Sequence, residues 1–142
     1  MSGYLLDTCA ISEFKRPRPD VGLMAWMNGI DQMTVYLSTL TIGELRYGIA
    51  SLSDHAKRAE LERWLTTEVL RDFRGRILSL DLDVADCWGN LRARGKTRGR
   101  MLSPIDGMIA ATALQKNLIV ITRNESDFAD TGVSLINPWK KA

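Results

Sequence analysis

Three acidic residues stand where short apolar stretches of the chain give way to helix-like sequence. Asp7 follows the apolar residues 4–6, Glu44 comes shortly after residues 35–38, and Asp106 comes two residues after a proline. In an α/β protein the carboxyl ends of parallel strands meet at one edge of the sheet, where ligands bind. Two like unit charges about 4 Å apart repel by roughly 4 kcal/mol at an effective dielectric near 20. Acids gathered there need raised pKa values or a divalent cation, and we expect the cation.

Each acid also has an ordinary structural explanation when it is taken alone. Asp7 can cap a helix by accepting backbone N–H bonds. Glu44 and Asp106 stand near helix starts, where a negative charge complements the helix dipole. Arg46 or Arg123 could also pair with a carboxylate and reduce the repulsion without any metal. A shared site requires that the three helices begin at one edge of one sheet, which the order of strands and helices predicts.

The residue types indicate which metal and which nucleophile to expect. Ligation by carboxylate oxygens suits Mg²⁺ or Mn²⁺ and not Zn²⁺. The chain has one histidine, His55, in a helix start that contains no partner for nucleophilic catalysis, so neither a Ser-His-Asp nor a Cys-His arrangement can be assembled. With no side-chain base available, a water activated by the metal is the expected nucleophile.

Apolar periodicity predicts strands that alternate with helices. We expect strands over residues 4–6, 35–38, 77–80, 118–121 and 133–136, and helical segments over 11–14, 20–28, 42–52, 54–70, 81–91 and 105–114. This alternation implies right-handed parallel crossovers and a three-layer α/β/α sandwich around a mainly parallel sheet of about five strands. The 142 residues suit one domain. We expect it to cover 1–142, with its core over about 3–139.

Composition excludes several classes of protein. The net charge is only +2, so any basic surface for a nucleic acid must be local. Cys9 and Cys87 lack the spacing of a metal site or a disulfide framework, which favours a cytoplasmic location. No apolar run reaches the 18 or so residues of a spanning helix, and we expect no membrane partner.

Five sequence blocks together resemble a known family. They are Leu5-Leu6-Asp7-Thr8, the string LTIGELRYG over residues 40–48, PIDGMIAATA over 104–113, ITRNESDF over 121–128, and Asn137-Pro138-Trp139. These blocks look like those of the PIN-domain ribonucleases and, among them, the VapC and FitB-like toxins of type II toxin–antitoxin modules. The resemblance runs from residue 4 to residue 139, and five blocks in order are far more specific than any one.

The resemblance implies a PIN-like domain in which Asp7, Glu44 and Asp106 hold Mg²⁺ or Mn²⁺ for hydrolysis of an RNA phosphodiester. Many members have a fourth acid directly after Thr-Arg, where this chain has Asn124. Asp127, three residues on, could partly substitute. The implied partners are an RNA substrate, a cognate antitoxin and a second copy of the chain. We therefore expect an endoribonuclease toxin. The alternative, which Asn124 favours, is a catalytically weak PIN-like RNA-binding module.

Hydroxyl and basic residues supply further candidates. Thr8, Ser38 and Thr122 follow strand ends, and their hydroxyls could orient the carboxylates or cap helices. A basic loop is expected over residues 92–100, just before the helix that bears Asp106. Its RNA-binding candidates are Arg94, Lys96, Arg98 and Arg100, and a solvated run of charges is the alternative.

Two further inferences follow from the sequence. Another basic loop, rich in proline, is expected over residues 15–19. A phosphoryl-aspartate receiver domain, a third hypothesis, would need a lysine near the fifth strand, and residues 133–137 contain none.

Overall fold

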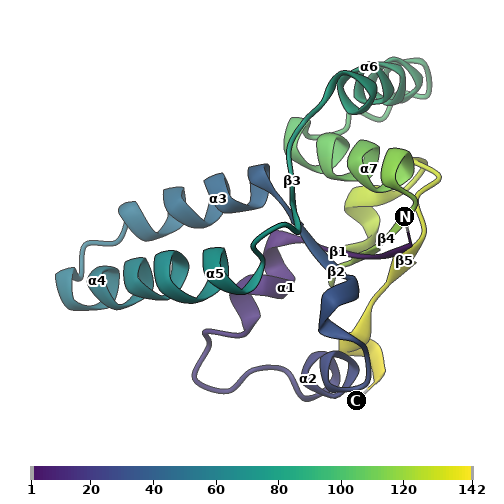
Figure 1. The fold of residues 1–142 in the computed structure, drawn as a ribbon. Coiled ribbons are helices and arrows are strands. Elements are labelled where there is room, and N and C mark those ends of the chain that lie inside the picture. The colour runs from purple at the N-terminus through teal and green to yellow at the C-terminus, as the bar shows by residue number, and fades with distance from the viewer. Residues whose placement is uncertain (1, 142) are drawn as a thin grey trace.

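Five short strands pair in parallel, in the spatial order β3-β2-β1-β4-β5 (Figure 1). The computed structural model describes residues 2–141. The strands are β1 Gly3–Leu6, β2 Val35–Ser38, β3 Ile77–Leu78, β4 Leu118–Ile121 and β5 Leu135–Ile136. The predicted parallel sheet of five strands is confirmed.

Helices fill most of the sequence between the strands. The α-helices are α1 Thr8–Glu13, α2 Val21–Asn28, α3 Thr39–Ala50, α4 His55–Trp64, α5 Leu70–Asp72, α6 Leu82–Thr97 and α7 Pro104–Lys116. A π-helical segment, η2 Leu65–Val69, joins α4 to α5, and three short 3₁₀ helices are η1 Gln32–Thr34, η3 Glu125–Phe128 and η4 Pro138–Lys141. Within residues 2–141, no helix is both long enough and apolar enough to cross a membrane.

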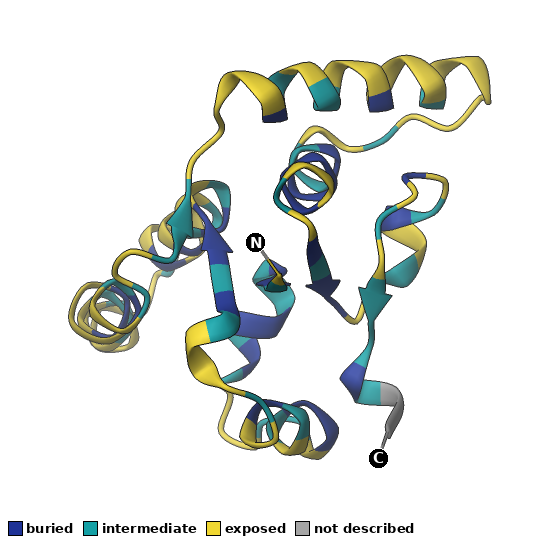
Figure 2. Ribbon diagram, turned by 45° about the vertical axis from the view of Figure 1, so that its right-hand side comes forward, coloured by how far each residue is buried: buried dark blue, intermediate teal, exposed yellow. Residues whose placement is uncertain are grey.

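Alternation along the strands divides the core into two halves. Successive strand residues point to opposite faces of a sheet. Leu6 and Ile121 accordingly pack with the apolar residues of α1 to α4 and η2, whereas Leu5 and Val120 pack with those of α6 and α7. The sheet thus lies between two helical layers, with α6 and α7 on one side (Figure 1). The outer surface of α6 is largely exposed (Figure 2). This is the expected three-layer sandwich.

The connections bring three helix starts to one edge of the sheet. β1 runs directly into α1, β2 runs directly into α3, and both strands are parallel. The last turn of α7 leads into the first residue of β4. The helix therefore runs back across the sheet, and its first turn lies near the carboxyl ends of the strands. This edge is the one at which the sequence predicts a shared site.

Small residues allow α7 to pack closely against both the sheet and α6. Ala110, Ala111 and Ala113 are buried on α7 and allow it to approach the sheet. Gly107, next to Asp106, lies against the indole of Trp88. A Cβ atom on this glycine would be 3.0 Å from Trp88 Cδ1, which is tighter than ordinary van der Waals contact.

Several predicted boundaries are wrong, for local reasons. α1 begins at Thr8 and not near residue 11, because Asp7 caps it. α3 begins at Thr39 and not near residue 42, because the Ser38 hydroxyl accepts the Leu40 N–H at 3.0 Å. β3 and β5 have only two residues each. Both are edge strands with a single neighbour.

Candidate active site

Asp7 is held at the end of β1 by backbone and side-chain hydrogen bonds. Its N–H donates to the Ile121 carbonyl at 3.0 Å, and its Oδ1 accepts the Thr8 N–H at 2.9 Å. Leu6 and Ile121 are register partners, so the residue after each strand also lies beside its counterpart. The Thr122 hydroxyl accordingly donates to Asp7 Oδ2 at 2.8 Å. The predicted cap and the predicted hydroxyl contact therefore coexist at Asp7.

Burial dominates the electrostatics of Asp7, which is only 6% exposed. It raises the pKa of this carboxyl, while the hydrogen bonds from Thr122, Thr8 and Cys9 oppose the shift and the charge of Asp127 adds to it. The Cys9 thiol lies 3.8 Å from Asp7 Oδ2. Burial also raises the pKa of this thiol, so it remains a neutral donor at neutral pH.

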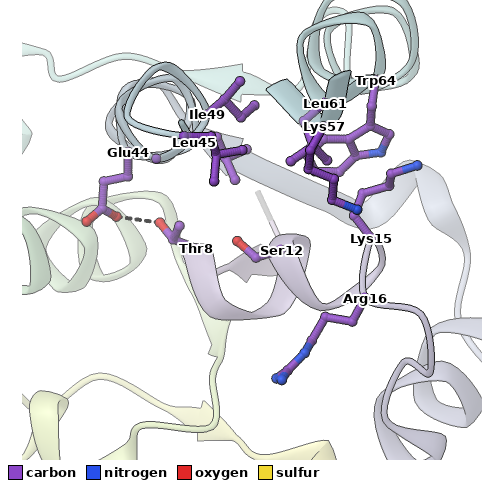
Figure 3. A pocket seen from close by; sticks show the side chains of 12 residues that line it. Thr8, Ser12, Lys15, Arg16, Glu44, Leu45, Ile49, Lys57, Leu61 and Trp64 are labelled. Atoms are coloured by element: carbon purple, nitrogen blue, oxygen red, sulfur yellow. Dashed lines mark hydrogen bonds between the residues drawn. The ribbon is translucent and has the colours of Figure 1, made fainter. Parts of the chain in front are cut away.

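Glu44 joins the site from α3. It is the sixth residue of that helix, beyond the first turn, so complementing the helix dipole explains it poorly. Its Oε1 accepts a hydrogen bond from the Thr8 hydroxyl, which also lies 3.3 Å from the Thr41 hydroxyl. Figure 3 shows Thr8 pointing toward Glu44 across the space between α1 and α3. Thr8 thus links the first and second predicted acids.

Asp106 stands in the first turn of α7, where Ser103 fixes it. The Ser103 hydroxyl donates to Asp106 Oδ2 at 2.9 Å and accepts the Asp106 N–H at 3.2 Å. Burial raises the pKa of Asp106, and the charges of Asp7, Asp127 and Glu44 raise it further. The hydrogen bond from Ser103 opposes this rise, and the carboxylates of three other segments lie close enough to Asp106 to repel its charge.

The segment after β4 contributes a weaker part of the site. Asn124 and Asp127 are both exposed. The Asn124 N–H donates to the Thr122 hydroxyl at 3.0 Å, but its side chain does not cap the following 3₁₀ helix. Asp127 acts through its charge, which contributes to the raised pKa values of Asp7 and Asp106. The structure thus associates Asp127 with the acids.

Two of the three predicted supporting hydroxyls contact carboxylates. Thr8 bonds Glu44 and Thr122 bonds Asp7, whereas Ser38 caps α3. Sequence reasoning missed the bond between Ser103 and Asp106. The available signal was the spacing Ser-x-x-Asp, which is that of a capping box and places the acid beside the capping hydroxyl.

The donor chemistry of the acids fits a hard divalent cation. Their ligand atoms are all oxygen, and oxygen-rich sites suit Mg²⁺ or Mn²⁺. Within residues 2–139, no lysine or arginine forms an ion pair with Asp7, Glu44 or Asp106, so neither Arg46 nor Arg123 relieves their repulsion by direct pairing. Over residues 2–141, no three acidic, histidine or cysteine side chains are grouped closely enough to hold a metal as they stand.

The predicted basic loop is wrong for residues 92–97, which form the last turns of α6. Arginine, alanine and lysine favour helix, and Gly95 permits close contact, since a Cβ there would lie 2.3 Å from the Arg100 carbonyl oxygen. Alternate residues of a helix point to nearly opposite sides, so this charge is dispersed. Arg100 Nε lies 3.5 Å from Asp130 Oδ2, and Arg98 Nη1 donates to the Asp130 carbonyl at 3.5 Å.

An apolar groove of about 270 Å³ adjoins the acids between α1, α3 and α4 (Figure 3). Thr8 and Glu44 lie at one end of it. Leu45, Ile49, Leu61 and Trp64 supply apolar surface, and Lys15, Arg16 and Lys57 supply positive charge. The groove therefore continues from the acidic site along the helical layer.

Sequence and structure comparisons agree with this architecture. The PIN domain family matches residues 4–133, and the chain belongs to that family. It is 39% identical to VapC ribonuclease Y4jK of Sinorhizobium fredii, over 97% of this chain and 99% of the relative. It is 42% identical to toxin FitB of Neisseria gonorrhoeae, over 95% and 97%. The crystal structure of FitAcB from the same organism superposes with a TM-score of 0.91 at 41% identity, covering 96% of this chain and 98% of that one.

Proposed function

We propose that this protein is a metal-dependent endoribonuclease and the toxin of a type II toxin–antitoxin module. The observation that carries the proposal is the convergence of Asp7, Glu44 and Asp106 on the carboxyl edge of the sheet, where the charges of Asp7, Asp127 and Glu44 raise the pKa of Asp106. The names of the relatives support it, since they are a VapC ribonuclease and a toxin. The repulsion suits a pocket that is completed by a cation.

Asp7, Glu44 and Asp106 would hold Mg²⁺ or Mn²⁺, with Asp127 or Asn124 contacting its waters. When bound, such an ion lowers the pKa of a coordinated water and stabilises charge on phosphoryl oxygens. The chain contributes the orientation of its ligands. Thr122 fixes one oxygen of Asp7, Thr8 fixes one oxygen of Glu44, and Ser103 fixes one oxygen of Asp106. Such partners typically change metal affinity by 10–100-fold.

The reaction would be hydrolysis by in-line attack of water on phosphorus. The new bond joins the water oxygen to phosphorus, the bond from phosphorus to the 3′ oxygen breaks, and that oxygen leaves as a hydroxyl. The products carry 5′-phosphate and 3′-hydroxyl ends. His55 is exposed on α4 and lies 2.7 Å from Arg58 through its Nδ1, so the acids have no histidine base beside them.

We further propose that the chain pairs with an antitoxin and with a second copy of itself in the cytoplasm. Related solved structures support a protein partner. FitAB bound to a DNA fragment superposes with a TM-score of 0.89 at 39% identity. An antitoxin that reaches the acids with a basic side chain would relieve the same repulsion as the cation.

Cleavage and end-mapping test the proposal. The purified chain should cut RNA with Mn²⁺ and not with EDTA, and Asp7→Asn and Asp106→Asn should be inactive. Expression of the chain alone in bacteria should arrest growth, and Asp7→Ala should not. Products with 2′,3′-cyclic phosphate ends would contradict the mechanism. RNA binding without Mn²⁺-dependent cleavage would favour the alternative, a catalytically weak RNA-binding module, which the neutral Asn124 keeps open.

A further inference from the structure

A second charged pocket lies at the end of α1 opposite Asp7, and the proposed function does not use it. This pocket of about 480 Å³ is lined by Glu13, Arg16, Pro17, Arg18, Asp20, Arg123 and Trp139. We propose that its three arginines bind phosphate groups of the RNA strand next to the bond that the acids cleave. We call Arg16, Arg18 and Arg123 the arginine cluster. The inference rests on the proposed function and adds a substrate-binding subsite to it.

The pocket adjoins the acidic site through two segments. Arg123 directly follows Thr122, whose hydroxyl bonds Asp7. Glu13 ends α1, the helix that Asp7 caps, and six residues of helix rise about 9 Å. A strand whose phosphate lies at the acids would therefore place a neighbouring phosphate within reach of the pocket.

The two acids of the pocket are already engaged by the protein. Glu13 is 6% exposed, and its Oε2 accepts the Asp20 N–H at 2.9 Å. Asp20 caps α2, since its Oδ2 accepts the Leu23 N–H at 3.0 Å. These carboxylates hold the chain between α1 and α2. Arg16 also forms an ion pair with Glu13, with 3.5 Å between Arg16 Nη1 and Glu13 Oε1. All three arginine side chains are exposed, so their remaining N–H groups can reach a ligand.

Arg123 is fixed in place by the C-terminal block. Its guanidinium lies 5.7 Å from the centre of the Trp139 ring. The Asn137 side chain donates to the Arg123 carbonyl at 3.4 Å and accepts the Trp139 N–H at 3.1 Å. The Asn-Pro-Trp block of the sequence therefore acts as a positioning element for Arg123. An arginine that is held before binding loses less freedom when it binds a phosphate.

Phosphate is the ligand that best explains three arginines beside four acids. A phosphodiester that approaches the carboxylates is repelled, so flanking cations must compensate. Guanidinium groups bind phosphate through two parallel hydrogen bonds. An acidic segment of a protein partner would also pair with arginine. The position of the cluster, next to the residue that bonds Asp7, favours the nucleic-acid strand that must be held against this repulsion.

Salt-dependent binding tests the inference. The cleavage-blocked Asp7→Asn protein is titrated into fluorescein-labelled single-stranded RNA at several KCl concentrations, and anisotropy is recorded. Each phosphate contact contributes about 0.7 to the slope of log K against log salt for single strands. Adding Arg16→Gln, Arg18→Gln and Arg123→Gln together should therefore reduce the slope by about 2. A matched control neutralises Arg63, Arg71 and Arg74, which are exposed on α4, α5 and the turn after α5, and should leave the slope unchanged.

Two single variants guard against a folding effect. Arg18 lies in the loop between α1 and α2, so Arg18→Gln should fold normally and reduce the slope by about 0.7. Arg123→Lys keeps the charge and should keep the slope. A triple variant that folds, as judged by circular dichroism, and binds with the slope of its parent would overturn the inference. Normal RNA binding with weakened binding of the antitoxin would also overturn it and would assign the cluster to the protein partner.

The outcome is separable from that of the proposed function. If the chain with Asp7 intact cleaves RNA and the triple variant keeps its slope, only the arginine cluster is excluded. If the chain neither cleaves nor binds RNA, both proposals fail.

Discussion

The junctions after β1 and β4 begin alike and end differently. The last residues of the two strands, Leu6 and Ile121, pair in the sheet, so the residues that follow them, Asp7 and Thr122, lie side by side. After β1 the helix α1 begins at the next residue but one, and Asp7 is a buried cap of that helix. After β4 a bend precedes a 3₁₀ helix, and Asn124 and Asp127 remain exposed. Position at a strand end thus brings side chains together, but the element that follows decides how firmly each is held.

The largest effect should come from the junction after β1. Asp7→Asn keeps a good helix cap but removes the buried charge, and a metal ligand that supplies several kcal/mol should cost cleavage at least about 10³-fold. Initial rates with Mn²⁺ measure the loss. The matched control is Asp54→Asn, which changes the exposed cap of α4 and should leave the rate unchanged. Equal losses in both variants would reduce Asp7 to a structural cap.

Thr122 tests whether the two junctions work together. Thr122→Val removes the donor to Asp7 Oδ2 with little change in volume, so Mn²⁺ affinity should fall about 10–100-fold. Calorimetric titration with Mn²⁺ measures it. Thr112→Val serves as a control, because that buried hydroxyl bonds only the Met108 carbonyl of its own helix among the bonds of the described residues. Unchanged affinity in Thr122→Val would show that burial alone orients Asp7.

Asn124→Asp places an acid after β4, as Asp7 does after β1. The added charge is exposed, where a contact is worth about 1 kcal/mol, so Mn²⁺ affinity should rise only about fivefold. The same titration measures it. A gain of 10²-fold or more would mean that the exposed junction matters as much as the buried one. Asp127→Asn in the same background reveals whether Asp127 had supplied the missing charge.

The smallest effect concerns stability without metal. Folding raises the pKa of Asp7, so the folded chain binds this proton more tightly than the unfolded chain does. The resulting stabilisation is fully present below the ordinary aspartate pKa and is lost as the pH rises through the raised pKa. Thermal midpoints in EDTA should fall over that window. Asp7→Asn should show a smaller fall than Asp54→Asn, and parallel curves would refute the shift.

The alternation of strands and helices, and the sheet edge that carries the acids, could be predicted from the sequence, whereas the order of the strands in the sheet was not predicted. Buried strands such as residues 118–121 are continuous apolar runs in the sequence. Asp7, Glu44 and Asp106 were singled out because each follows a strand or opens a helix. Their metal-binding role stays a prediction, which is supported by the charges of Asp7 and Glu44 that raise the pKa of Asp106.

Other features depend on contacts that a local pattern does not contain. The basic run of residues 92–100 suggested a loop, but α6 continues to Thr97, and Gly95 allows the Arg100 carbonyl to approach the helix closely. The arginine cluster was missed for the opposite reason. Arg123 is distant in the sequence from Arg16 and Arg18, and they meet in one pocket where the C-terminal block packs against α2 and bonds the segment after β4.

The contact of Gly107 with Trp88 makes the position of Asp106 sensitive to the size of the residue at position 107. A methyl group at this position would have to displace the indole by a few tenths of an ångström, or tilt the turn that carries Asp106. A purely steric change behind the carboxylate would thereby shift Asp106 while every ligand atom stays the same.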